Sequence, residues 1–181
     1  MSDTDRMANV EPVRLGPQSQ FKFKCHPGVE CFTECCRDIN IILTPYDIIQ
    51  LKNKLQLTSE EFLAIYTEPQ MLEKTGLPVI TLKFLKDEES DSDSKRCPFG
   101  TENGCLVYDS RPTLCPNYPL GVASLSHKED VDGEEFYFFV HEPHCLGFKE
   151  EKLWTVKEWR KDQGVDIHDE INAEWTDLLV R

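Results

Sequence analysis

Eight cysteines in a chain of 181 residues constrain its fold more than any other feature of the sequence. They form two groups: Cys25, Cys31, Cys35 and Cys36, then Cys97, Cys105, Cys115 and Cys145. The first residues contain no apolar stretch of the kind that directs secretion, so we expect a cytoplasmic protein, in which disulfides are rare. Clustered thiols in a reducing compartment are typical of metal sites, whereas a single cysteine is usually a small buried apolar residue. We therefore predict that all eight cysteines bind metal.

The spacing of the cysteines differs from that of a zinc knuckle, which presents two sulfurs from a Cys-x2-Cys turn. No such turn occurs in the sequence. The side chains of the adjacent Cys35 and Cys36 diverge, which favours ligation of two metals or of two irons in one cluster. The later cysteines are separated by 7, 9 and 29 residues, so that only the fold can bring them together. Two tetrathiolate sites, two cubane clusters or one polynuclear centre all fit, and each site could mix the two groups.

The charge and the sequence motifs exclude several classes of function. Acidic residues outnumber basic residues by 33 to 20, and a net charge of −13 repels phosphate backbones, so no nucleic-acid partner is expected. No apolar run approaches the ~20 residues of a membrane helix, so no membrane partner is expected. The sequence also lacks the nucleophile-elbow, phosphate-loop and dinucleotide-binding motifs. Any catalysis would therefore take place at the metal.

The residue pattern predicts an α+β protein with a small antiparallel sheet, about four helices and irregular metal-binding cysteine loops. We expect a flexible N-terminal arm over residues 1–20 and a single cysteine-cluster domain over residues 21–181. Alternating apolar residues predict strands over 21–25 and 79–85. Segments 120–126 and 135–141 predict a hairpin that closes at Asp132-Gly133, and its second strand is apolar on both faces, as in the centre of a sheet. The acidic stretch over 87–94 is predicted to be a solvated loop.

Capping residues locate the predicted helices. Thr44 with Asp47 and Thr58 with Glu61 are typical helix starts, and Thr155 begins a third helix that Gly164 ends. We expect the second helix to bury Phe62, Ile65 and Tyr66 and to end before Pro69. The last helix carries one apolar stripe, made of Ile167, Ile171, Trp175, Leu178 and Leu179.

Three residues are candidates to support the metal ligands without binding the metal: Arg111, Tyr118 and His144. A guanidinium beside thiolates offsets their mutual repulsion and donates hydrogen bonds to sulfur. Histidine could also replace a sulfur ligand, for which the candidates are His26, His141 and His144, whereas His127 and His168 have the pattern of surface residues. Asp47 and Asp109 could ligate or brace the site, although capping and turn roles are sufficient to explain them.

Several segments carry a family resemblance, and the string from Arg111 to Pro119, Arg-Pro-x2-Cys-x2-Tyr-Pro, is the most specific of them. The others are Cys35-Cys36 followed by residues 42–48, Cys97-Pro98-Phe99, residues 104–108, Pro119-Leu120, residues 144–148 and residues 155–159. Together they resemble the YkgJ-type cysteine-cluster family of zinc- or iron-chelating domains over roughly residues 21–175. The chain departs from the family pattern in its first cysteine gap of five residues and in Pro116, where an arginine is common.

The resemblance implies metal chelation. Some relatives are described as iron–sulfur oxidoreductases, and flagellin lysine methylases carry a similar cluster, although this chain is short for methylase activity. Our first hypothesis is therefore a protein that holds iron, as an iron–sulfur centre for redox or electron-transfer chemistry, with a protein redox partner. The alternative is a zinc-stabilised structural or interaction module without catalysis. A third hypothesis is metal sensing or storage. The sequence leaves the metal, its nuclearity and any enzymatic activity undecided.

Overall fold

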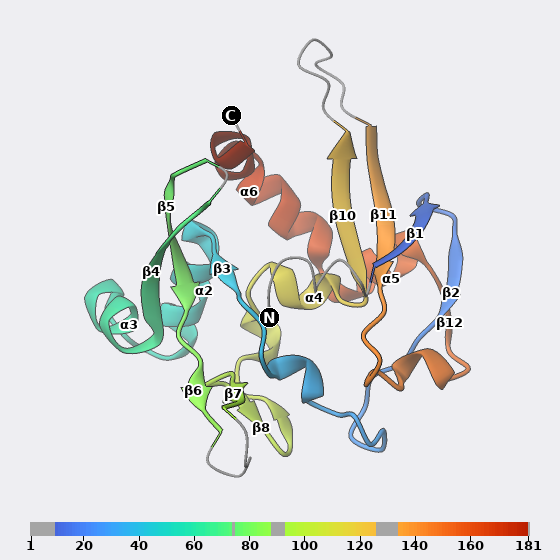
Figure 1. Ribbon diagram of the computed structural model, residues 1–181, viewed down its shortest axis with the longest axis horizontal. Coiled ribbons are helices and arrows are strands. Elements are labelled where there is room, and N and C mark those ends of the chain that lie inside the picture. Colours follow the sequence, from blue (N-terminus) through green and yellow to red (C-terminus); the bar gives the residue numbers. More distant parts are fainter. Residues whose placement is uncertain (1–9, 74, 88–92, 126–133, 181) are drawn as a thin grey trace. The chain divides into compact units, whose positions relative to one another are not determined.

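The computed structural model describes residues 10–73, 75–87, 93–125 and 134–180, and its helices and antiparallel sheets confirm the predicted α+β class (Figure 1). The sequence predicts one small sheet, whereas the described strands form several sheets of two or three strands. The chain divides into two compact units. Unit 1 comprises residues 1–31 and 117–163, and unit 2 comprises residues 32–116 and 164–181.

Unit 1 contains an antiparallel sheet with the strand order β1 (Val10–Leu15), β11 (Glu134–Val140), β10 (Leu120–Leu125). Strands β10 and β11 form the predicted hairpin, and β11 is the central strand, as its two apolar faces predict. The predicted turn at Asp132-Gly133 lies outside the described residues. Strand β1 falls within the segment predicted to be a flexible arm, where residues 10–15 instead pair with β11.

The rest of unit 1 includes a short sheet and a helix that share the unit's apolar core. Strand β2 (Gln20–Lys22) pairs with β12 (Leu153–Thr155), and helix α5 (Val156–Gln163) follows directly. Thr155 and Glu158 exchange hydrogen bonds at the start of α5, as the predicted cap requires. The buried core residues are Leu15, Phe21, Phe23, Leu120, Val156 and Trp159.

Unit 2 contains a second three-stranded sheet, with the order β3 (Ile42–Leu43), β5 (Pro78–Leu82), β4 (Thr67–Met71). The predicted capping boxes of Thr44 and Thr58 are both formed, at the starts of helices α2 (Pro45–Lys54) and α3 (Ser59–Tyr66). The sequence does not predict strand β4, which contains Pro69. Proline is tolerated there because β4 is an edge strand.

Two predicted apolar faces in unit 2 are confirmed only in part. On α3, Phe62 is fully buried and Tyr66 packs against the core as predicted, whereas Ile65 is 54% exposed. The last helix, α6 (Val165–Val180), exposes Ile167, Ile171 and Leu178 of its predicted stripe. Its buried positions include Val165 and Asn172 instead. The side chain of Asn172 donates to Thr113, which accounts for its burial.

The segments that carry the cysteines of unit 2 are short. They and their neighbours are η1 (Glu34–Cys36), β6 (Leu85–Lys86) paired with β7 (Lys95–Arg96), β8 (Gly100–Thr101) paired with β9 (Gly104–Cys105), η2 (Tyr108–Ser110) and α4 (Leu114–Asn117). Asp87 opens the stretch that the sequence predicts to be a solvated loop, but it is buried and paired with Arg37. Residues 88–92 of that stretch lie outside the described residues.

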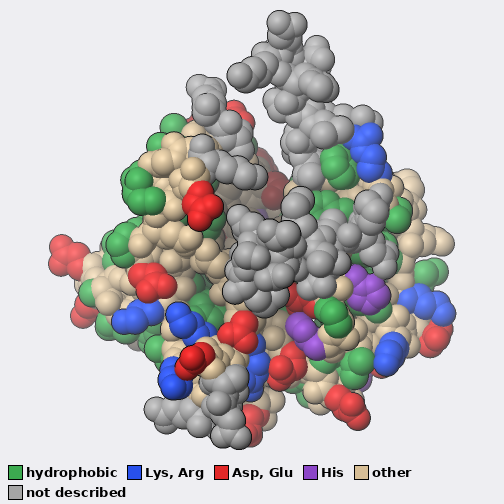
Figure 2. All heavy atoms as spheres, in the orientation of Figure 1, with side chains coloured by type: hydrophobic (Ala, Val, Ile, Leu, Met, Phe, Trp, Pro, Cys, Tyr) green, Lys and Arg blue, Asp and Glu red, His purple; other side chains and the backbone are tan. Residues whose placement is uncertain are grey.

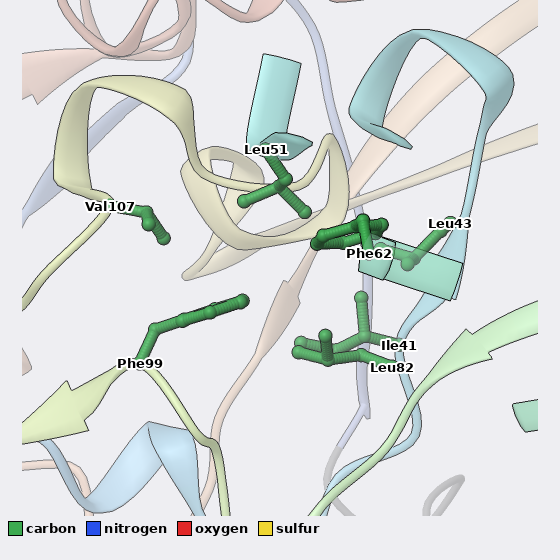
Figure 3. Close-up of a cluster of buried hydrophobic side chains, with 7 residues drawn as sticks. All are labelled: Ile41, Leu43, Leu51, Phe62, Leu82, Phe99 and Val107. Carbon is green, nitrogen blue, oxygen red and sulfur yellow. The ribbon is translucent and has the colours of Figure 1, made fainter. Parts of the chain in front are cut away.

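The core of unit 2 gathers side chains from the regular elements and from the cysteine segments (Figure 3). Its buried residues are Ile41, Leu43, Leu51, Phe62, Leu82, Phe99 and Val107. Phe99 and Val107 each follow a cysteine by two positions, and both side chains point toward the core interior. Cys97, Cys105 and Cys115 pack against the same core. Ordinary apolar packing therefore anchors the cysteine segments of unit 2.

The surface of the described residues is mixed in character. In the space-filling view, acidic, basic and apolar side chains are interspersed (Figure 2). Among the described residues, no helix has both the length and the apolar character needed to cross a membrane.

Candidate metal centre

Backbone pairing in unit 2 brings the first cysteine group to the second. The N–H of Cys97 donates to the carbonyl of Cys36 at 2.8 Å, and Arg37 and Arg96 form an antiparallel bridge next to it. Gly100 packs closely against the side chain of Cys36, since a Cβ built on Gly100 would be 3.3 Å from Cβ of Cys36. The adjacent cysteine pair and Cys97 therefore belong to one local structure, although they are far apart in the sequence.

A tight hairpin then places Cys105 beside the segment that begins at Cys97. Cys105 pairs with Gly100 across strands β8 and β9. Gly104, the first residue of β9, has a φ of +115°, a backbone conformation that other residues rarely adopt. A Cβ on Gly104 would also approach the ring of Phe32 to 3.3 Å. The hairpin geometry thus depends on a residue without a side chain.

Backbone N–H groups point at two of the sulfurs. The N–H groups of Phe99 and Gly100 hydrogen-bond to the sulfur of Cys97, and the N–H of Val107 hydrogen-bonds to the sulfur of Cys105. Each of these bonds lowers the pKa of its thiol, because it favours the charged thiolate. N–H···S bonds of this kind also tune the redox potential of thiolate-bound iron. The local backbone is therefore suited to hold thiolates.

Four cysteines of unit 2 interact electrostatically: Cys35, Cys97, Cys105 and Cys115. Burial is the main cause that raises the pKa of Cys97 to about 11, and the nearby Cys105 and Cys35 raise it further. Burial and Cys35 likewise raise the pKa of Cys105. Burial also raises the pKa of Cys115, with additional contributions from Cys97, Cys105 and Cys35. Thiols that perturb one another in this way lie close together, so the set mixes one cysteine of the first sequence group with three of the second.

Arg111 lies close enough to Cys105 and Cys115 for its charge to act on their thiols. Its guanidinium lowers the pKa of Cys105 and of Cys115, against the larger effect of burial. The side chain is held in place by Tyr108, because Nε donates to the Tyr108 carbonyl at 2.9 Å and the guanidinium lies 3.9 Å from the centre of the Tyr108 ring. This position suits the supporting role that the sequence predicts for Arg111.

The cysteines of unit 1 lie around a different segment, residues 145–147. Leu146 N–H donates to Sγ of Cys31 at 3.1 Å. Lys24, which precedes Cys25, donates its N–H to the carbonyl of Gly147 at 3.1 Å. The backbone thus brings the regions of Cys25 and Cys31 to Cys145. Cys25 is exposed, whereas the other two are half-buried.

The remaining sequence candidates of unit 1 have partners of their own. Nδ1 of His26 accepts from the N–H of Gly28 at 3.1 Å, and its Nε2 lies 3.3 Å from Oε2 of Glu150. His144 is paired with Glu142 at 3.1 Å. The ring of Tyr118 packs edge-on against Phe23, with the ring centres 6.0 Å apart. The supporting roles predicted for Tyr118 and His144 stay predictions.

All eight cysteines are present as thiols. Among the described residues, no group of three or more His, Cys, Asp or Glu side chains is arranged to hold a metal ion. Thiols can affect one another's pKa without being arranged to bind one ion, because charges interact over longer distances than metal–ligand bonds. The four sulfurs of unit 2 are near one another without converging on one point. Their donor set, four thiols with N–H groups directed at two of them, fits zinc or iron chemically.

The sequence interpretation missed a polar network in unit 2. Asp47 is fully buried, and besides capping α2 it accepts from Thr113 twice, from N at 2.9 Å and from Oγ1 at 2.7 Å. Thr113 Oγ1 also lies 2.9 Å from Nδ1 of His168 and 3.1 Å from Nδ2 of Asn172. The side chain of His168 is therefore mostly buried, and the prediction of a surface residue is wrong. The spacing of Val165, His168 and Asn172, at i, i+3 and i+7, is the signal that could have revealed this face.

The chain was compared with known protein families, curated proteins and solved structures. The family model named CxxCxxCC and described as "Putative zinc- or iron-chelating domain" matches residues 24–152, well over half of the chain. No curated protein and no solved structure matches the chain significantly.

Proposed function

Because the chain belongs to the CxxCxxCC family of zinc- or iron-chelating domains, we propose that Cys35, Cys97, Cys105 and Cys115 form one metal centre in unit 2. The supporting observation is that Cys97, Cys105 and Cys115 pack against one core, while the N–H of Cys97 is hydrogen-bonded to the carbonyl of Cys36, the neighbour of Cys35. The effect of the four thiols on one another's pKa values agrees with it. Cys25, Cys31 and Cys145 belong to a second group, in unit 1. Cys36 is the remaining predicted ligand. Since the four sulfurs do not converge on one point, ligation requires the side chains to turn toward the metal.

The proposed metal is iron, as an iron–sulfur centre used in redox or electron-transfer chemistry in the cytoplasm. Bound iron would supply an electron-accepting and electron-donating group. The chain's own contribution is to provide deprotonated sulfurs, to direct the N–H groups of Phe99, Gly100 and Val107 at two of them, and to place the charge of Arg111 nearby. These features stabilise a negatively charged tetrathiolate site and set the potential of an electron carrier.

The alternative is a zinc site that only stabilises the fold. Four thiolates fill the tetrahedral coordination of zinc and leave no open position, as in structural sites. The packing of Cys97, Cys105 and Cys115 against the core of unit 2 favours this alternative, because loss of the metal would then destabilise the core.

Anaerobic purification followed by elemental and acid-labile sulfide analysis distinguishes the two functions. Iron with a matching amount of sulfide and visible absorbance supports the redox proposal. A colourless protein that is saturated with zinc overturns it in favour of the structural module. A chain that is purified without metal, and that binds neither iron nor zinc when each is added, overturns metal binding itself.

Two serine variants test the assignment of the ligands. Cys35→Ser is expected to expose Cys97, Cys105 and Cys115 to alkylation in the metal-loaded protein, measured site by site by mass spectrometry. Cys25→Ser is the matched control, because it alters a cysteine of unit 1. If Cys25→Ser exposes the three unit 2 thiols as strongly as Cys35→Ser does, the proposed division of the cysteines is wrong.

A further inference from the structure

Helix α6 buries the polar Asn172 beside the apolar Val165, while three residues of its predicted apolar stripe are exposed, which departs from the usual arrangement. Asn172 is 4% exposed, while Ile167 is 58% and Ile171 is 50% exposed. Burial of polar groups is unfavourable unless they are hydrogen-bonded. The hydrogen bond from Asn172 to Thr113 therefore accounts for the burial of this polar side chain.

The hydroxyl of Thr113 uses its full hydrogen-bonding capacity. A hydroxyl has one proton to donate and two lone pairs that accept. Since a carboxylate can only accept, the hydroxyl donates to Asp47 at 2.7 Å. It then accepts from Nδ2 of Asn172 at 3.1 Å and from Nδ1 of His168 at 2.9 Å. This assignment places the proton of a neutral imidazole on Nδ1. Burial, which lowers the pKa of His168, favours the same neutral form.

The position of Thr113 gives these bonds a consequence for the metal centre. Thr113 lies two residues after Arg111 and two residues before Cys115. Its own N–H is fixed by Asp47 at 2.9 Å, and the N–H of Cys115 closes a turn on the carbonyl of Pro112 at 2.8 Å. The backbone between the guanidinium and the thiol is thus held at its midpoint.

We propose that His168 and Asn172 make α6 a latch for the metal centre: by binding Thr113 together with Asp47, they hold the segment from Arg111 to Cys115 in its ligating position. The two residues are positioning residues, since neither is placed among the ligands. The inference rests on the proposed function of the unit 2 cysteines. It assigns to α6, which carries no cysteine, control over how long the centre keeps its metal.

Removal of either α6 side chain tests the latch in the full chain. His168→Ala and Asn172→Ala are each expected to release zinc about tenfold faster to an excess of chromogenic chelator, because each leaves buried hydrogen-bonding groups unsatisfied. His168→Asn keeps a donor near the position of Nδ1 and is expected to recover most of the wild-type rate. Thr113→Ser keeps the hydroxyl and is expected to behave like wild type, whereas Thr113→Val is expected to release metal rapidly.

Two control variants separate the latch from a general loss of stability. Glu170→Ala changes an exposed residue of α6 and is expected to leave the release rate unchanged. Val79→Ala weakens the interior of unit 2 without touching the network. If His168→Ala releases metal no faster than Val79→Ala at matched unfolding midpoints of the metal-free proteins, the latch is refuted.

A second measurement keeps the latch testable if the proposed function fails. In the metal-free protein, His168→Ala is expected to accelerate alkylation of Cys115 about tenfold relative to Cys25. An unchanged ratio contradicts the latch whether or not the wild type binds metal. A wild type that binds no metal while this ratio rises would overturn the proposed function and leave the positioning of Cys115 supported.

Discussion

The two units treat their cysteines differently. In unit 2, Cys97, Cys105 and Cys115 pack against an apolar core, and their pKa values are raised by burial and by one another. In unit 1, Cys25 is exposed and Cys31 accepts a backbone N–H from Leu146. The difference shows that a cluster of thiols can rest on an apolar core in one unit and reach the surface in the other. The raised pKa values of Cys97, Cys105 and Cys115 favour the protonated thiols, so metal binding to them would displace protons.

The strongest test of this contrast is thiol reactivity in the metal-free protein. A pKa of about 11 leaves Cys97 with about 100-fold less thiolate at pH 8 than an ordinary cysteine. We therefore expect iodoacetamide to alkylate Cys97 at least about 100-fold more slowly than the exposed Cys25, as followed by mass spectrometry. A short peptide with one cysteine provides the reference rate. Equal rates at the two cysteines would remove the contrast between the units.

The pH dependence of stability sharpens the contrast. Because the folded pKa of Cys97 lies above the unfolded value, its contribution to stability is fully present below pH ~8.5 and is lost as the pH rises toward 11. The raised pKa values of Cys105 and Cys115 act in the same direction. We expect urea unfolding of the metal-free protein to lose on the order of 2 kcal/mol between about pH 8 and pH 10.5. Cys97→Ser serves as the control and is expected to reduce this loss, while Cys105 and Cys115 still contribute to it.

The smallest of these effects concerns Arg111. Arg111→Gln removes the charge that favours the thiolates of Cys105 and Cys115, and we expect metal affinity to fall by about fivefold in a chelator competition. Arg111→Lys keeps the charge and is expected to recover part of the loss. Lys54→Gln, an exposed change in the same unit, is the matched control. A fall of the same size in the control would show that only the net charge of the chain matters.

Local signals predicted much of the fold. The capping boxes at Thr44 and Thr58 depend on residues three positions apart, and both are present. The hairpin of β10 and β11 follows from two neighbouring apolar segments. Strand β4 was missed because it contains Pro69, and only its position at the sheet edge makes the proline acceptable.

Contacts between distant residues account for what the sequence did not predict. The grouping of Cys35 with three later cysteines depends on backbone pairing between the residues that follow η1 and strand β7. The spacing of the cysteines in the sequence does not predict this pairing. The inward face of α6 is likewise set by Thr113 and Asp47, not by the stripe that includes Ile167 and Ile171. Hydrophobic periodicity identifies a helix, but a buried polar partner can shift the face that the helix turns inward.

The division of the chain into units has a consequence for the order in which the protein is made. Unit 2 is interrupted in the sequence, since residues 117–163 of unit 1 are inserted before α6. A growing chain therefore contains Cys35, Cys97, Cys105 and Cys115 well before it contains His168 and Asn172. During synthesis the four thiols are available while nothing from α6 yet holds Thr113. In the proposed metal centre, the thiols would therefore be available to bind metal before α6 is present to retain it.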